Sequence, residues 1–214
     1  MNDKAIYVVL VKAMTGLGRF ARKFTKYPYT HIAVCMNDSL EEFISFSRKS
    51  HYAIFDAGFM REKRSHYAFG KHESFQAKVF RIPVSSEIYE RIMEYINSIE
   101  NDSEYIFNIF SMITMGIFHG VRIYKAHNCM SFTSKIIEMT ETVQLNKKYH
   151  KYNIKEIDNL LSEYLFEERQ YYKSETDEEY MSGNKFLKNL VLLFKLNGQL
   201  FFRFLFKRNE DKWY

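Results

Sequence analysis

Residues 6–11, with the sequence Ile-Tyr-Val-Val-Leu-Val, place the strongest constraint on the fold. The run is entirely apolar or aromatic and rich in β-branched side chains, which is typical of a strand covered on both faces. Such a strand needs a sheet with a packed layer on each side. The chain has the material for this, because 46% of its 214 residues are hydrophobic and 17% are aromatic. This length favours one domain with an extension.

Further strands and helices are predicted around this run. Residues 29–36 and 42–47 read as the two strands of a hairpin, and residues 75–82 as another strand. Apolar residues recur at helical spacing in the stretches 88–96, 105–117 and 154–165. We therefore expect an α+β domain in which an antiparallel sheet packs against helices. Residues 48–74 show no clear periodicity and predict no element.

The predicted organisation has three parts. A domain occupies residues 1–165, an acidic connector residues 166–182, and a basic, aromatic extension residues 183–214. The extension has seven basic and two acidic side chains, so it carries the whole net charge of +5 and leaves the rest near neutral. A domain without net positive charge does not predict a nucleic-acid partner.

The C-terminal extension is expected to form an amphipathic helix. Its apolar runs are interrupted by lysine and arginine too often to favour a transmembrane span. Insertion of the aromatic side chains into an anionic membrane surface fits this pattern. Packing on the domain or on a partner is an alternative that the sequence leaves open. Because the first residues lack a cleavable signal, we expect a cytoplasmic protein, peripheral on the inner face of the membrane if the extension binds lipid.

The two cysteines, Cys35 and Cys129, can form neither a disulfide framework nor a four-cysteine zinc site. The seven histidines show no spacing that would hold a metal. The sequence therefore predicts no metal and no cofactor.

Cys129 stands at the predicted start of a helix. Asn128 is a good N-cap, and Phe132 and Ile136 begin the apolar face of the helix. The helix dipole and the unpaired N–H groups of a first turn favour a thiolate, which is the nucleophilic form of cysteine. A free cysteine is also a common core residue, so a catalytic interpretation requires a histidine partner.

His31 is the preferred partner. It begins the strand 29–36, and a rigid strand can hold an imidazole in place as a general base. Alternation along the hairpin brings Ser45 onto the neighbouring strand. His127 is the rival because it is near Cys129 in sequence, but side chains two residues apart at a helix start point in different directions. The histidines of the polar segment 48–74 are expected to be solvated: His51, His66 and His72.

Three short motifs occur in a characteristic order. They are Tyr-Thr-His-Ile-Ala-Val at 29–34, Glu-Phe-Ile-Ser-Phe-Ser-Arg-Lys at 42–49, and Asn-Cys-Met-Ser-Phe at 128–132. Over residues 5–160 this order resembles the circularly permuted papain-like cysteine enzymes, which include permuted NlpC-type hydrolases, YiiX-like bacterial proteins and lecithin retinol acyltransferase-like proteins. In papain itself the cysteine precedes the histidine, and permutation reverses the order.

The resemblance implies a permuted papain-like fold for residues 1–165. It also implies that Cys129 is the nucleophile, that His31 is the base, and that a third polar residue at or near Ser45 orients the imidazole. Many relatives have a histidine or an acidic residue at the third position, so serine is a departure. The implied reaction is hydrolysis of an amide or ester through an acyl-thioester. Peptide-like substrates, including cell-wall stem peptides, are expected first.

Two other functions remain open at this stage. The basic aromatic extension suggests a lipid acyltransferase or thioesterase that uses the same Cys129–His31 pair on a lipid acyl substrate at a membrane. The serine at the third position suggests a binding module on a papain-like scaffold that has no catalytic activity.

Overall fold

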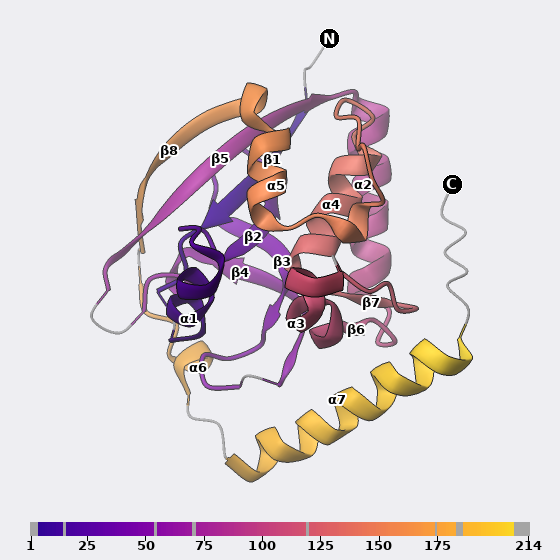
Figure 1. Ribbon diagram of the computed structural model, residues 1–214. Helices are drawn as coiled ribbons and strands as arrows, with labels where there is room; N and C mark the ends of the chain where they lie inside the picture. The colour runs from indigo at the N-terminus through magenta and orange to yellow at the C-terminus, as the bar shows by residue number, and fades with distance from the viewer. Residues whose placement is uncertain are drawn as a thin grey trace.

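A six-stranded antiparallel sheet forms the centre of the protein (Figure 1). The computed structural model describes residues 4–14, 16–53, 55–69, 72–118, 120–173, 175–182 and 186–207. In the order β4-β3-β2-β1-β5-β8, the strands of the sheet are Ala57–Lys63, Glu42–Arg48, His31–Cys35, Lys4–Val11, Ser74–Val84 and Leu165–Tyr172. Two short parallel strands, β6 (Ile106–Phe107) and β7 (Ala126–His127), pair separately.

Helices complete the α+β architecture that the sequence predicts. They are α1 (Gly16–Thr25), α2 (Ser86–Glu100), α3 (Ile109–Phe118), α4 (Cys129–Met139), α5 (Ile154–Leu160), α6 (Glu178–Met181) and α7 (Phe186–Phe206). Single 3-10 turns occupy Arg64–His66, Tyr149–Lys151 and Ser162–Tyr164. The expected helix over 105–117 begins only at Ile109, because Ile106 and Phe107 instead pair with β7.

Strand β1 lies inside the sheet, between β2 and β5, as its apolar run predicts. Successive side chains of a strand point to opposite faces. One face of β1 carries Ile6, Val8 and Leu10, and the other carries Tyr7, Val9 and Val11, all of them buried. Both faces of the sheet therefore need a covering layer.

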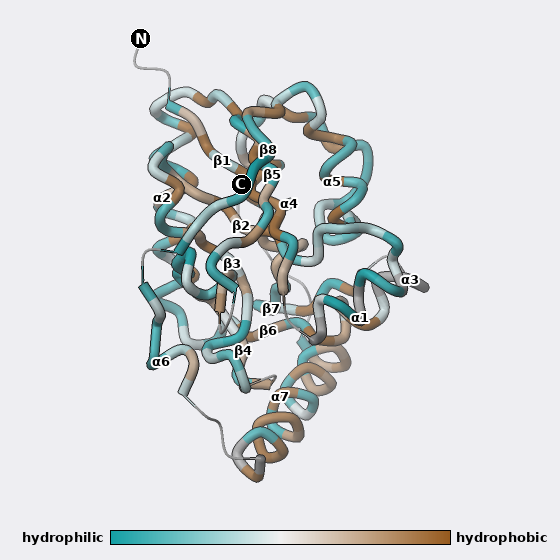
Figure 2. The backbone as a smooth tube through the Cα atoms, turned by 90° about the vertical axis from the view of Figure 1, so that its left-hand side faces the viewer, coloured by the Kyte–Doolittle hydropathy of each residue, from teal (hydrophilic) through white to brown (hydrophobic). Residues whose placement is uncertain are grey.

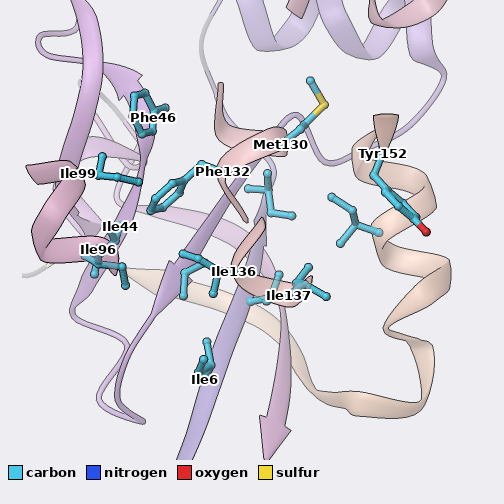
Figure 3. Packing of buried hydrophobic residues seen from close by; sticks show 14 of the residues in the cluster. Ile6, Ile44, Phe46, Ile96, Ile99, Met130, Phe132, Ile136, Ile137 and Tyr152 are labelled. Atoms are coloured by element: carbon cyan, nitrogen blue, oxygen red, sulfur yellow. The ribbon is translucent and has the colours of Figure 1, made fainter. Parts of the chain in front are cut away.

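Helices α2 and α4 belong to the larger of the two cores, which lies on one face of the sheet (Figure 3). Phe132 and Ile136 of α4 are fully buried there, and the ring of Phe132 packs on that of Phe46 of β3 with a tilt of 54° between the ring planes. A smaller core on the opposite face contains Val9, Cys35 and Tyr67. Because the apolar side chains of α4 pack on the sheet, they determine the position of Cys129, the first residue of the helix.

Residues 166–182 were expected to form an acidic connector, but they contain regular secondary structure. Its first part is the edge strand β8, which pairs with β5 through partners such as Ala77 and Arg169. Most β8 side chains are exposed, and charged residues are common on edge strands because they discourage pairing with other chains. The polar sequence of β8 is therefore typical of a solvated segment, although its backbone pairs with β5. Farther on, Tyr180 of α6 is buried against the domain.

The segment 48–74 also contains structure that the sequence did not predict. Strand β4 pairs with β3 over seven residues, from Glu42 opposite Lys63 to Arg48 opposite Ala57. Its burial follows no regular alternation, because β4 is an edge strand with Gly58 and several long polar side chains. The hydrophobic period that identifies a strand is consequently missing.

Helix α7 forms the described part of the C-terminal extension; residues 183–185 and 208–214 lie outside the described residues. Figure 2 shows that hydrophobic residues predominate along it. By length and composition it is the one described helix that could cross a membrane, and 17% of its Asn189–Phe206 window is buried.

The α4 core predicts a large stability effect at Ile136. Ile136→Ala removes a fully buried side chain and leaves a cavity, so it should lower the free energy of unfolding by about 2–5 kcal/mol. Ile113→Ala on α3 is the matched control, because Ile113 is 68% exposed and should change stability by less than about 0.5 kcal/mol. Urea unfolding measures both, and equal losses would contradict the described packing.

Candidate active site

Cys129 is the first residue of α4. A capping box sets the start of the helix: the side chain of Asn128 accepts from the backbone N–H of Ser131, and the Ser131 hydroxyl accepts from the N–H of Asn128. The first N–H groups of a helix have no partners within it, and the helix dipole is positive at this end. The thiol is partly buried. The sulfur of Cys129 therefore lies in the first turn of α4, at the positive end of the helix dipole.

His31 is the first residue of β2, opposite Val11 in the register of the sheet. Its Nε2 atom lies 2.9 Å from Oε2 of Glu62 and 3.3 Å from the hydroxyl oxygen of Ser45. The Cys129 thiol lies close enough to the imidazole to contribute, after the charge of Glu62, to the raised pKa of His31. Because Glu62 occupies Nε2, Nδ1 is the ring nitrogen that remains for the thiol. The structure thus brings together the cysteine and the histidine that the sequence singled out.

Glu62 is the residue that the sequence analysis missed. It lies on β4, opposite Phe43 of β3, and only 2% of it is exposed. Its Oε2 atom accepts hydrogen bonds from the Ser45 hydroxyl at 2.5 Å and from the Tyr67 hydroxyl at 2.9 Å, in addition to its contact with His31. A buried carboxylate needs such partners, because burial of an unpaired charge is very costly.

The charges of His31 and Glu62 stabilise each other. Burial opposes protonation of His31, but the charge of Glu62 and hydrogen bonds with Cys129 and Glu62 outweigh it and raise the pKa of His31 well above its usual range. Burial likewise opposes ionisation of Glu62, but the charge of His31 and hydrogen bonds from His31 and Ser45 hold the pKa of Glu62 below its usual range. The favoured state is an imidazolium paired with a carboxylate.

Ser45 lies beside His31, where the sequence analysis placed it. Its hydroxyl donates to Glu62, however, so it supports the carboxylate as well as contacting the imidazole. The carboxylate that contacts the imidazole therefore comes from Glu62, one strand farther along the sheet than Ser45. No strand was predicted over 57–63, so Glu62 could not be placed near His31 from the sequence.

His127, the rival partner, has a different environment. Its Nδ1 atom lies 3.3 Å from the hydroxyl of Ser131, and its ring packs against Phe46 and stacks on Tyr105. The expectation that the histidines of 48–74 are solvated was wrong for His66, which is buried, stacks on a tyrosine and contacts Asp177. Residues 177–180 lie against it, which the sequence pattern does not reveal.

A cavity of about 500 Å³ lies elsewhere, between β4, the end of α2 and α7. Phe59, Tyr105 and Leu196 are among its lining residues, and neither Cys129 nor His31 borders it. Within the described ranges, no group of three His, Cys, Asp or Glu side chains is arranged to hold a metal ion.

No known protein-family model matches this sequence, and neither a curated protein nor a solved structure matches it. The interpretation of the site therefore depends on its own geometry.

The ion pair predicts how His31 titrates. Glu62→Gln removes the negative charge that raises the pKa of His31, while burial continues to lower it, so the imidazole should lose its proton at a lower pH than in the wild type. The ¹H–¹³C NMR signal of the ring, followed against pH, measures this. In the wild type the ring should remain protonated well above pH 6.5, the ordinary value.

Ser45→Ala is the matched control for this titration, because it removes one hydrogen bond to Glu62 and leaves the carboxylate in place. It should shift the titration of His31 less than Glu62→Gln does. If the two variants titrate alike, or if Glu62→Gln leaves the curve unchanged, the carboxylate does not control the imidazole.

Proposed function

We propose that the protein is a cysteine hydrolase with Cys129 as the nucleophile, His31 as the acid and base, and Glu62 as the residue that positions His31. The observation that carries the proposal is that one imidazole contacts both the thiol at the start of α4 and a buried carboxylate. Covalent acyl transfer requires a nucleophile, a base next to it, and a group that orients the base. The thiol, the imidazole and the carboxylate are arranged in this order.

In the proposed reaction, the proton of the Cys129 thiol has already passed to His31 in the resting pair, so the imidazole is protonated, and the sulfur attacks the carbonyl carbon of an amide or ester. The backbone N–H of Cys129, in the first turn of α4, donates to the oxyanion that forms. The imidazolium returns its proton to the leaving amine or alcohol as its bond to the carbonyl carbon breaks, and an acyl-thioester remains. Water then loses a proton to His31, attacks the thioester and releases a carboxylic acid and the thiol.

Glu62 would act on His31 and not on the substrate. By accepting from Nε2, it fixes the tautomer that leaves Nδ1 facing Cys129, and it stabilises the imidazolium formed after proton transfer. Tyr67 and Ser45 hold the carboxylate in turn. The proposed chain of contacts therefore runs from the Cys129 thiol through His31 and Glu62 to the hydroxyl groups of Ser45 and Tyr67.

We also propose that the domain has a permuted papain-like fold. The order of the parts supports this: a histidine at the start of an early sheet strand, then a helix that packs on the sheet and begins with cysteine. The resemblance implies peptide-like amides as the first substrates to test, including cell-wall stem peptides. A binding module without catalysis loses its main support, because Glu62 supplies the carboxylate that serine at the third position had left in doubt.

Thiol reactivity tests the proposed nucleophile. Iodoacetamide labelling at pH 7, followed by mass spectrometry, should modify Cys129 much faster than Cys35, which is fully buried. His31→Asn should slow the labelling of Cys129 by about tenfold or more, because the imidazolium no longer stabilises a thiolate. His66→Asn is the matched control, since it removes another buried histidine that contacts a carboxylate, and it should leave the rate unchanged.

Turnover tests the reaction itself. A panel of peptide amides and short acyl esters should include substrates that the wild type hydrolyses, and Cys129→Ala should abolish this hydrolysis while circular dichroism shows an intact fold. Turnover that persists in Cys129→Ala would refute the mechanism. A rate of Cys129 alkylation no faster in the wild type than in His31→Asn would also refute it.

A further inference from the structure

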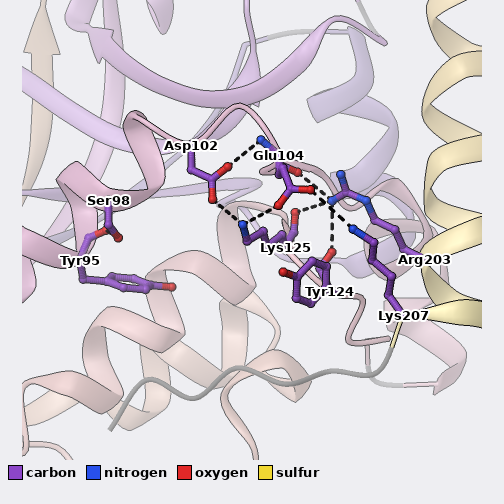
Figure 4. A network of polar contacts seen from close by, with 8 residues as sticks. All are labelled: Tyr95, Ser98, Asp102, Glu104, Tyr124, Lys125, Arg203 and Lys207. Carbon is purple, nitrogen blue, oxygen red and sulfur yellow. Dashed lines mark hydrogen bonds and ion pairs between the residues drawn. The ribbon is translucent and has the colours of Figure 1, made fainter.

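Helix α7 is fastened to the domain along one narrow stripe. Leu196 and Leu200 are buried, and so is Arg203, which is 8% exposed. One guanidinium nitrogen of Arg203 lies 2.7 Å from the carbonyl oxygen of Glu104, 3.2 Å from that of Tyr124 and 3.1 Å from that of Lys125 (Figure 4). These three contacts with carbonyl oxygens fix α7 against the segments that lead into β6 and β7.

The opposite face of α7 is apolar and open. The residues Leu187, Val191, Phe194, Phe201 and Leu205 recur at spacings of three, four and seven, so they share one side of the helix. All five are more than half exposed, and Phe194 is 70% exposed. Phe202, Phe204 and Phe206 enlarge this exposed surface. An apolar face of this length is unusual on a soluble monomer and is typical of an interaction site.

The charges of α7 indicate what covers this face. The helix contains no aspartate or glutamate, and Lys195 is exposed, whereas the adjoining Lys207 pairs with Glu104 of the domain. Exposed aromatic side chains on a helix that carries an exposed lysine, Lys195, and no acidic residue match the acyl and headgroup layers of an anionic lipid surface. A second copy of the protein fits less well, because two such helices would bring their Lys195 side chains together and neither helix has an acidic residue to pair with them.

We propose that α7 docks the protein on an anionic lipid surface, with the helix lying in the plane of the membrane. The face that contains Phe194 would enter the acyl boundary, and Lys195 would contact the headgroups. A transmembrane orientation would require the buried contacts of Arg203 to break and its charge to enter the hydrocarbon, which is strongly unfavourable. The in-plane orientation keeps those contacts.

Docking through α7 would also orient the proposed active site. Arg203 contacts the carbonyl of Lys125, which is in the short segment that leads through β7 to Cys129. Figure 1 shows α7 crossing the end of the molecule at which β6 and β7 lie. The membrane would therefore lie beyond the end of the molecule that carries these short strands. Docking itself does not depend on the proposed hydrolase activity.

Co-sedimentation of the full chain with vesicles tests docking. Vesicles of phosphatidylcholine with phosphatidylglycerol should bind the wild type more tightly than phosphatidylcholine alone, and added salt should reduce the difference. The double substitution Phe194→Gln and Leu205→Gln should weaken binding by about tenfold or more, because two apolar side chains no longer enter the lipid.

Tyr172→Gln is the matched control, because it removes an exposed aromatic side chain from β8 and leaves α7 intact. It should bind vesicles as the wild type does, and circular dichroism should show that all variants fold. Failure of the wild type to bind, equal losses in the control, or a dimer that the α7 substitutions dissociate would overturn the proposal. Alkaline carbonate should release the bound protein; resistance to it would indicate a spanning helix and overturn the in-plane orientation.

Discussion

The buried carboxylate of Glu62 is the constraint around which the candidate site is arranged. Glu62 is only 2% exposed, so its charge must be compensated by buried partners. These partners are His31 on β2, Ser45 on β3 and Tyr67 in the turn after β4. These three contacts fix the imidazole in one orientation and favour its protonated form. Removal of the carboxylate would affect both the order of this face of the sheet and the state of the imidazole next to Cys129.

Helix α4 connects the stability of the core to the chemistry of the site. Its apolar residues, including Phe132 and Ile136, are fully buried against the sheet, and this packing determines where its first turn lies. Cys129 thus occupies a position that the core specifies with high precision, since close-packed interiors tolerate little displacement. The other reacting group, His31, lies on strand β2. Both reacting groups are therefore held by a helix or a strand and not by loops.

The two sides of helix α7 have different surroundings. The stripe with Leu200 and Arg203 is bound to the domain, whereas the stripe with Phe194 is open. The sequence had left membrane binding and packing on the domain as alternatives. The structure shows packing for one side, and the proposed lipid contact concerns the other, so the two are compatible.

The sequence by itself determined the α+β class, the inner position of β1, the start of α4 at Cys129 and the neighbouring placement of His31 and Ser45. These features depend on local periodicity, capping and hairpin alternation, which a chain displays directly. Only the tertiary structure decided that β4 and β8 are strands and that Glu62 meets His31. Both strands lie at the edges of the sheet, where half-exposed polar side chains mask the period, and the pairing of Glu62 with His31 depends on a register that no local pattern records.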